Sequence, residues 1–412
     1  VGKSTVAREF GKNEYETFIA IDFAKCPAEV KELFEDISDL DFIFMRLQMI
    51  YDVELKERKS LIIFDEVQLC PKARQAIKYL VEDGRYDYLE TGSLLSIRQN
   101  VKDIVIPSEE EEVTLNPLDY EEFRWALGDK VSVPLLRQFF DKRKGMGDTA
   151  NRSTMRDFRL YMLVGGMPQA VVTYIETKNL AKVDHTKRNI IKLYEKDFNK
   201  IDRSGNASKM FHAIPSQLQS NASRYIVAAA TDGGRKNRLM ETISDMEDSM
   251  VVNIAYHVDD PNVGMAQTMN KNAFKMFVCD TGLFVTLVFW DKDFTENIIY
   301  EKLLSDKLPA NLGYVYENVV AQTIKASGYE LYYHTFPKED GKHYYEIDFL
   351  IPEGDKINPI EMKSSGYNRH ASLDAFFQKY HARIKQQYLV YTKDLRKDGM
   401  ITGLPVYFTQ FL

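Results

Sequence analysis

The sequence is poor in cysteine and contains no long hydrophobic run. Its three cysteines lie far apart and lack Cys-x-x-Cys spacing: Cys26, Cys70 and Cys279. They therefore predict neither a disulfide framework nor a zinc site, and a reducing compartment fits best. The longest strongly apolar stretch covers residues 283–290, far short of the roughly 20 residues that a membrane span requires. Since no signal peptide is visible either, we expect a cytoplasmic protein that makes no contact with a membrane.

A strong excess of charge is also missing. The net charge is −7 and the isoelectric point is near 5.7, which argues against a protein that coats nucleic acid through bulk positive charge. A local basic groove is compatible with this average, so DNA stays a candidate partner. The length of 412 residues and the hydrophobic content of 44% predict two to four folded domains, at about 150 residues per domain.

The second half of a phosphate-binding P-loop stands at the start of the sequence, as Gly2-Lys3-Ser4-Thr5. In the complete G-x-x-x-x-G-K-[ST] motif, backbone N–H groups surround the phosphates, the lysine reaches the terminal phosphates and the hydroxyl coordinates Mg²⁺. Lys3 and Ser4 would take the last two roles, at the N-terminus of a helix whose dipole attracts the anion. Four residues alone are also compatible with a chance match.

The first half of this motif, and the strand that precedes it, do not appear in the sequence, which starts at Val1. In ATPases with a P-loop that strand is central to the sheet. We therefore expect the chain as written to be an N-terminally truncated ATPase, which binds nucleotide poorly unless the missing residues are restored.

A buried strand that ends in two carboxylates is predicted at residues 60–66. Four apolar residues run into Asp65 and Glu66, as in a parallel strand whose acidic pair emerges at the edge where ligands bind. Asp65 would hold Mg²⁺, and Glu66 would polarise the attacking water as a general base. The alternative is that the acidic pair only caps the helix expected from about Pro71.

A third strand-like segment, residues 86–93, ends in small polar residues. Thr91 or Ser93 stands where such ATPases place a sensor for the γ-phosphate, although either also suits the N-cap of the next helix. Residues 113–123 are expected to add a last strand and a capped helix. Three partial signals in the expected order favour a P-loop NTPase, with ATP and Mg²⁺ as cofactors, over coincidence.

The middle of the chain is predicted to be mostly helical. The helical pattern from about residue 131 to residue 201 is interrupted by Gly165-Gly166, which fit a hinge or a close-packing turn as well as an ordinary interhelical turn. Helices followed by two strand-like runs, residues 251–256 and 274–278, fit a winged-helix module. Such modules bind DNA or other proteins, and the fold alone does not choose between these partners.

Three carboxylates and a lysine are distributed over one expected helix and two expected strands near the C-terminus. Glu317 lies in the helix and Asp348 in the strand-like run 345–351, while Glu361 and Lys363 follow a second strand-like run. Glu361 and Lys363 would point to one face, and Asp348 would meet Glu361 around a divalent cation. Glu317 is a further candidate ligand of that cation. Lys363 would stabilise developing charge or orient water, while the metal polarises a phosphoryl oxygen.

Together these motifs resemble prokaryotic AAA+-type ATPases that carry a C-terminal domain of uncharacterised function with a restriction-endonuclease-like core. Besides the C-terminal acidic residues, the resemblance rests on Gly2-Lys3-Ser4-Thr5, Phe64-Asp65-Glu66-Val67-Gln68, Glu90-Thr91-Gly92-Ser93, Asn116-Pro117-Leu118-Asp119-Tyr120-Glu121-Glu122-Phe123 and Val164-Gly165-Gly166-Met167-Pro168-Gln169-Ala170-Val171. It covers essentially the whole chain and implies an α/β protein. The implied parts are an ATPase core with a parallel sheet at 1–130, a helical lid at 131–204, a winged-helix module at 205–304 and a restriction-endonuclease-like domain at 305–412.

The resemblance implies an ATP-binding protein and ATP hydrolase that couples its nucleotide state to a nuclease-like, DNA-directed domain. The alternative is a nucleotide-regulated binding or scaffold protein, because the restriction-endonuclease-like fold also occurs in proteins that have lost cutting. An unrelated α/β domain is a third interpretation of the C-terminal part. Members of this class commonly receive an arginine finger from a neighbouring subunit, so a homo-oligomer is a candidate state, although we assign no arginine to that role.

Overall fold

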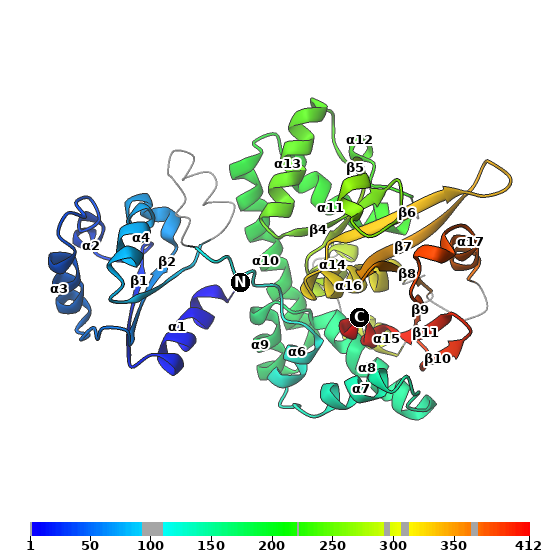
Figure 1. Cartoon of the computed structure of the whole chain (residues 1–412), viewed down its shortest axis with the longest axis horizontal. Helices are drawn as coiled ribbons and strands as arrows, with labels where there is room; N and C mark the ends of the chain where they lie inside the picture. The colour runs from blue at the N-terminus through cyan, green and yellow to red at the C-terminus, as the bar shows by residue number, and fades with distance from the viewer. Residues whose placement is uncertain (1, 93–109, 221, 292–296, 306–312, 364–369) are drawn as a thin grey trace. The chain divides into compact units, whose positions relative to one another are not determined.

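The computed structural model of the protein describes residues 2–92, 110–220, 222–291, 297–305, 313–363 and 370–412 (Figure 1). The chain divides into two compact units, residues 1–115 and residues 116–412. Each unit has its own sheet and its own hydrophobic clusters. Among the described residues, no helix combines the length with the apolar character that a bilayer-spanning segment needs.

The first unit is built around a three-stranded parallel sheet in the order β1-β2-β3. Its strands are β1 (Thr17–Asp22), β2 (Ser60–Asp65) and β3 (Asp87–Glu90), and its helices are α1 (Lys3–Glu14), α2 (Ala28–Glu32), α3 (Leu40–Tyr51), the short 3₁₀ helix η1 (Val67–Leu69) and α4 (Pro71–Asp83). All six residues of the central strand β2 are buried, as expected for a parallel strand that is covered on both faces. The strands β2 and β3, which were predicted to carry the acidic pair and the sensor residues, are direct neighbours in the sheet.

Hydrophobic side chains cover both faces of β2. On one face, Ala7 of α1 packs with Leu61 and Ile63, whereas Phe64 belongs to a different cluster that includes residues of α2, α3 and α4. Successive β2 side chains join different clusters because they point to opposite faces of the sheet. The strand is thus held between two apolar layers, which fixes the position of Asp65 at its C-terminal end.

The second unit combines helices with an eight-stranded mixed sheet in the order β10-β11-β9-β8-β7-β6-β4-β5. Its helices are α6 (Tyr120–Ala126), α7 (Ser132–Asp141), α8 (Asp148–Val164), α9 (Pro168–Thr177), α10 (Leu180–Ile201), α11 (Asn206–Gln219), α12 (Val227–Ala230), α13 (Lys236–Asp248), α14 (Thr281–Val288), α15 (Asn297–Leu304), α16 (Gly313–Ala326) and α17 (Ala371–Tyr380), with 3₁₀ helices η2 (Met265–Thr268), η3 (His381–Arg383) and η4 (Val406–Phe411). Its strands are β4 (Val252–Val258), β5 (Met269–Val278), β6 (Leu331–Pro337), β7 (Tyr344–Glu353), β8 (Lys356–Met362), β9 (Gln387–Tyr391), β10 (Arg396–Asp398) and β11 (Ile401–Pro405). The pairs β4–β6, β8–β9 and β9–β11 are parallel, and the other pairs are antiparallel.

The two faces of this sheet contribute to different hydrophobic clusters. Phe349 and Ile351 of β7 join a large cluster that includes residues of α8, α10, α11 and α16. Leu350 of the same strand packs instead with Leu373 and Phe376 of α17. The helices from the middle of the chain therefore share one core with the strands of the C-terminal region.

The β4–β5 hairpin lies at a place that differs from its predicted one. Its two strands were expected, but as the ribbon of a separate winged-helix module. Instead, β4 pairs in parallel with β6, with Ala255 opposite Leu331, so that the backbone groups of β4 are satisfied within the eight-stranded sheet. The proposed boundary between residues 304 and 305 thus does not separate two sheets. The division into a lid, a winged-helix module and a restriction-endonuclease-like domain stays a prediction.

Residues 113–116 do not form the strand that was predicted for them. Val113 is 84% exposed, and within the described ranges residues 113–116 belong to neither sheet, so their apolar side chains alone do not make a strand. The capped helix that follows is confirmed. Helix α6 begins after Asp119, whose side chain accepts a hydrogen bond from the Glu122 N–H while the Glu122 side chain accepts one from the Asp119 N–H.

The Gly165-Gly166 turn is a point of close packing. A Cβ atom on Gly166 would collide with the carbonyl oxygen of Leu118, and one on Gly165, whose φ is +84°, would collide with the Asp280 carboxylate. The Gly166 N–H donates to Asp280 Oδ2 at 2.5 Å. Of the alternatives considered for this pair, the structure supports the close-packing turn, since only glycine fits both the space and the backbone conformation.

Candidate nucleotide site and acidic cluster

Helix α1 begins directly at the half P-loop. Its first residue is Lys3, and the preceding Gly2 adopts the left-handed conformation with φ 88°, which glycine adopts without strain. Among the described residues, no side chain caps this helix end, so its N–H groups and dipole suit an anion. Burial lowers the pKa of the Lys3 ammonium, and the charges of Glu66 and Asp65 counter part of that shift. A phosphate beside Lys3 would supply the negative charge that this buried cation favours.

Ser4 and Asp65 meet between the start of α1 and the end of β2. The Ser4 hydroxyl donates to Asp65 Oδ1 at 2.7 Å, and the Thr91 hydroxyl, which follows β3, donates to the same oxygen. Asp65 is 4% exposed, and its Oδ2 lies 3.8 Å from a guanidinium nitrogen of Arg8. Two motifs that are 61 residues apart in the sequence thus converge on one carboxylate. A hydroxyl and a carboxylate are oxygen ligands of the kind that Mg²⁺ prefers, so this donor set fits the ion.

Glu66 follows Asp65 in a backbone conformation that is uncommon for a residue with a side chain. Its φ is +55°, in the left-handed region that non-glycine residues rarely adopt and that clusters at functional sites. The Gln68 side-chain amide donates to Glu66 Oε2 at 2.5 Å. Gln68 is 4% exposed, and its Oε1 has no hydrogen-bond partner among the described residues. Gln68 therefore orients the carboxylate that was predicted to act as the general base.

The other residues predicted for this site have mixed outcomes. Thr91 is 7% exposed and joins Asp65, as a residue near the γ-phosphate would. Ser93 lies outside the described residues, so the choice between the two sensor candidates rests on Thr91 alone. Thr5 is exposed in the first turn of α1. The structure thus brings Lys3, Ser4, Asp65 and Thr91 to one edge of the sheet, together with Glu66.

A buried arginine that contacts two glutamates near this edge was not predicted. Arg74 of α4 is 6% exposed, donates to Glu110 Oε2 at 3.0 Å and lies 3.8 Å from Glu90 Oε2. Burial raises the pKa of Glu90 to about 7, the Glu110 charge adds to the increase and Arg74 opposes it. Glu90 and Gln68 belong to motifs recognised in the sequence, but their contacts depend on α4 and on the loop after β2. The signal in the sequence that could have indicated these contacts was the presence of polar residues at or just after the strand ends.

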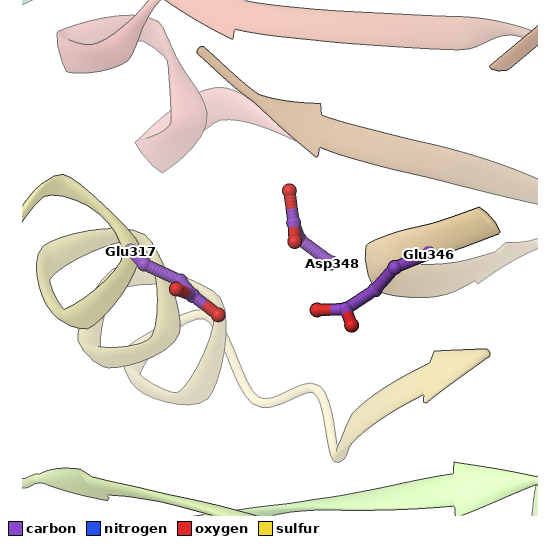
Figure 2. A group of neighbouring side chains, drawn as sticks. All are labelled: Glu317, Glu346 and Asp348. Atoms are coloured by element: carbon purple, nitrogen blue, oxygen red, sulfur yellow. The ribbon is translucent and has the colours of Figure 1, made fainter. Parts of the chain in front are cut away.

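Three acidic side chains converge in the second unit (Figure 2). Glu317 comes from α16, and Glu346 and Asp348 come from β7, with one carboxylate oxygen of each within 4.8 Å of the others. Glu317 and Asp348 were predicted to share a site, and the structure brings them together. Glu346 was missed, although its position two residues before Asp348 puts both side chains on the same face of the strand.

Lys275 of β5 reaches into this acidic cluster, defined as Glu317, Glu346 and Asp348. Its Nζ donates to Glu317 Oε1 at 2.8 Å, donates to Glu346 Oε1 and lies 4.0 Å from Asp348 Oδ1. Burial disfavours the charge of this side chain, which is 7% exposed, but the three carboxylates outweigh burial and raise the pKa of Lys275 well above its usual range. Lys275 therefore carries its positive charge inside the cluster.

Glu361 and Lys363 pair with each other, and Glu361 is not a member of the acidic cluster. Lys363 Nζ lies 2.6 Å from Glu361 Oε1, and Glu361 Oε2 is buried without a hydrogen-bond partner among the described residues. Burial raises the pKa of the Glu361 carboxyl, and Lys363 opposes that shift. Asp348 is bound from the β8 side, because its Oδ2 accepts a hydrogen bond from the Met362 N–H at 2.7 Å. The metal and catalytic roles predicted for Asp348, Glu361 and Lys363 stay predictions.

Comparisons with known proteins assign the first of these regions. Residues 1–124 match a family model described as an AAA domain. The first unit is an AAA domain. This match confirms the P-loop ATPase domain that was predicted from the sequence, and it suggests ATP binding and hydrolysis. Each of the two further matches is to a domain of unknown function, DUF8612 at residues 155–293 and DUF4143 at residues 312–407.

Comparisons over the whole chain give little information beyond the match to the AAA domain. No curated protein matches the chain. Among solved structures, the protein VC1899 from Vibrio cholerae is 10% identical, with 92% of this chain and 89% of that chain covered and a TM-score of 0.18. A likeness at that level carries no argument about the fold. In residues 116–412, the acidic cluster and the residues around it are the features that bear on function.

Proposed function

We propose that the AAA domain binds ATP and hydrolyses it, with Ser4 and Asp65 as the protein ligands of Mg²⁺. The observation that supports this most directly is the 2.7 Å hydrogen bond between Ser4 Oγ and Asp65 Oδ1. It joins the hydroxyl of the P-loop motif to the acidic end of a buried parallel strand, as a shared metal requires. Bound Mg²⁺ would neutralise charge on the phosphates and orient them.

The remaining residues of the site have roles that follow from their positions. Lys3 and the N–H groups at the start of α1 would hold the phosphates, because both present positive charge at the same helix end. Glu66 would accept the proton of the attacking water. The Gln68 amide, at 2.5 Å from Glu66 Oε2, would hold that carboxylate in place. The Thr91 hydroxyl, which donates a hydrogen bond to Asp65, would lie near the terminal phosphate and sense whether it is present.

A second candidate function concerns residues 312–407. Asp348, Glu361 and Lys363 have the order and residue types of a metal-dependent nuclease site, and the unpartnered buried Glu361 Oε2 is the observation that favours cutting. The ammonium of Lys275 between Glu317 and Glu346 favours the other interpretation, in which this region binds a partner without cutting it. We propose the latter, a nucleotide-regulated binding or scaffold protein, with DNA or protein as the partner class.

The ATPase is tested by steady-state hydrolysis of ATP by the full-length protein in the presence of Mg²⁺. Lys3→Ala is expected to abolish ATP binding, whereas Glu66→Gln should retain binding and lose about 10²–10⁴-fold in kcat, the usual range for a general base. Glu82→Gln is the matched control, because Glu82 is exposed in α4 of the same unit. Unchanged hydrolysis by both Lys3→Ala and Glu66→Gln would remove the roles proposed for these residues.

The second candidate is tested by incubating supercoiled plasmid with the full-length protein and Mn²⁺ or Mg²⁺, with and without ATP. We expect no cleavage above the level of the Glu361→Ala and Lys363→Ala variants. Metal-dependent cleavage that both substitutions remove would instead establish a nuclease. Retention of the plasmid in a mobility assay, without cleavage, would identify DNA as the bound partner.

A further inference from the structure

The acidic cluster is supplied by elements that are far apart in the sequence. Glu317 lies in α16, and Glu346 and Asp348 lie in β7, whereas Lys275 lies in β5, the strand at one end of the sheet. The residue that pairs with Lys275 on β4 is Ala255. Neighbouring strands place paired side chains on the same face, and Ala255 pairs in turn with Leu331 of β6, so Lys275 faces the same side of the sheet as residues of β6.

Lys275 satisfies the cluster in the way a bound cation would. An ammonium has three N–H donors and no acceptor, and Lys275 directs them at carboxylates of both α16 and β7, at 2.8 Å from Glu317 Oε1 and within hydrogen-bond range of Glu346 Oε1. Its side chain is 7% exposed, so this charge is withdrawn from water and depends on its acidic neighbours. A buried charge without such partners would be strongly unfavourable.

A divalent metal and this ammonium cannot use the cluster at the same time. Mg²⁺ binds oxygen at about 2.0–2.1 Å and requires near-octahedral geometry, so it would have to lie among the same oxygens that now surround Lys275 Nζ. Two cations at that separation would repel each other inside a buried site. One oxygen of Asp348 has a further partner, because Oδ2 accepts a hydrogen bond from the Met362 N–H.

We propose that Lys275 is the resident cation of this cluster, and that its ammonium occupies the position between Glu317, Glu346 and Asp348 that a divalent ion would otherwise take. This inference rests on the second candidate function, the one without cutting, and gives it a physical cause. A residue of the chain itself therefore excludes a metal ion from the cluster. The same contacts connect the end strand β5 to α16 and β7. The Lys275 ammonium thus has a structural role at the position where a divalent ion would have a catalytic one.

The test is a titration of the full-length protein with Mn²⁺ in the absence of nucleotide, followed by the electron paramagnetic resonance signal of free Mn²⁺. All proteins carry Asp65→Asn, so that the candidate metal site of the AAA domain does not contribute. With Lys275 in place we expect no Mn²⁺ site that Glu346→Gln can weaken. Lys275→Met should gain one Mn²⁺ site per chain, and adding Glu346→Gln should remove it again.

Control variants separate charge from folding. Lys275→Arg keeps the positive charge and should leave the cluster closed, whereas Lys275→Gln keeps a hydrogen-bond donor without charge and should open it if Lys275→Met fails to fold. Binding of Mn²⁺ by the protein with Lys275, weakened by Glu346→Gln, would overturn the proposal. A folded Lys275→Met or Lys275→Gln protein that binds no Mn²⁺ would overturn it as well. Plasmid cleavage reports on the second candidate function independently, so the two failures are distinguishable.

Discussion

The two candidate sites use the same kinds of residue in opposite ways. In the AAA domain, the Asp65 carboxylate receives hydroxyl groups from Ser4 and Thr91, and the lysine of the motif, Lys3, stands at the helix end. In the acidic cluster, Lys275 contacts the carboxylates directly. A carboxylate that accepts hydrogen bonds from neutral hydroxyls can still bind a metal, and a lysine that nearby carboxylates balance only in part can still bind a phosphate. When a lysine pairs directly with carboxylates, the positive and negative charges neutralise each other, and neither is available for a ligand.

The strongest way to break this comparison is to remove the charge of each lysine. Lys275→Met leaves three carboxylates without their cation, and we expect a loss of about 3–5 kcal/mol in local stability, the usual cost of breaking a buried pair. Lys3→Met should cost little, because burial already lowers the pKa of Lys3 and positive charge at a helix N-terminus is unfavourable. Hydrogen exchange of α16 and β7 amides in one variant, and of α1 and β2 amides in the other, measures both effects. Equal losses at the two sites would contradict the comparison.

A second experiment uses the pH dependence of the AAA domain. The pKa of Glu90 is raised from 4.5 to about 7 in the folded state, so the folded state binds this proton more tightly than the unfolded state does. The stability that Glu90 contributes is therefore full below pH 4.5, falls as the pH rises toward 7 and stays lower above it, by about 3 kcal/mol at most.

Glu90→Gln should flatten this dependence, since it removes the titrating group but keeps the shape. The measurement is hydrogen exchange of β2 and β3 amides at pH 5 and pH 8, corrected for the intrinsic exchange rate. The exposed Asp87→Asn variant at the start of β3 is the control. A pH dependence that survives in Glu90→Gln would assign it to other groups.

The smallest effect is expected at Arg8. Its guanidinium lies 3.8 Å from Asp65 Oδ2 and its side chain is 50% exposed, so water screens the pair. Arg8→Ala should change the stability of the AAA domain by less than about 1 kcal/mol. Thermal unfolding at low and at high salt measures this contribution. A larger loss would show that Asp65 depends on Arg8 as well as on the hydroxyls, which would make the first site more like the second.

Local patterns predicted the AAA domain well because its chemistry is written in short segments. Ser4 and Lys3 belong to one motif, and Asp65 and Glu66 end one apolar strand. The continuous apolar run of β2 and the acidic pair at its end were sufficient to predict where Asp65 and Glu66 lie. The strand predicted at residues 113–116 failed for the complementary reason, since a strand requires a partner that local sequence does not reveal.

The acidic cluster was only half predicted because its members are joined by long-range pairing. Glu317 and Asp348 were expected from their order, and Glu346 lies two residues from Asp348. Lys275 was not expected, because it lies 71 residues from Glu346 and 42 from Glu317 on a hairpin that was assigned to another module. Its contact depends on the parallel pairing of β4 with β6, and no periodicity in either strand specifies that pairing.

The sequence by itself determined which residues stand at strand ends and helix starts, and with them the candidate phosphate-binding residues of the AAA domain. Backbone geometry over a few residues is enough for this, because side-chain direction follows from the period of a helix or strand. The tertiary structure alone decided which cation meets the C-terminal carboxylates. That outcome depends on the order of strands in the sheet, which is set by the packing of the whole second unit.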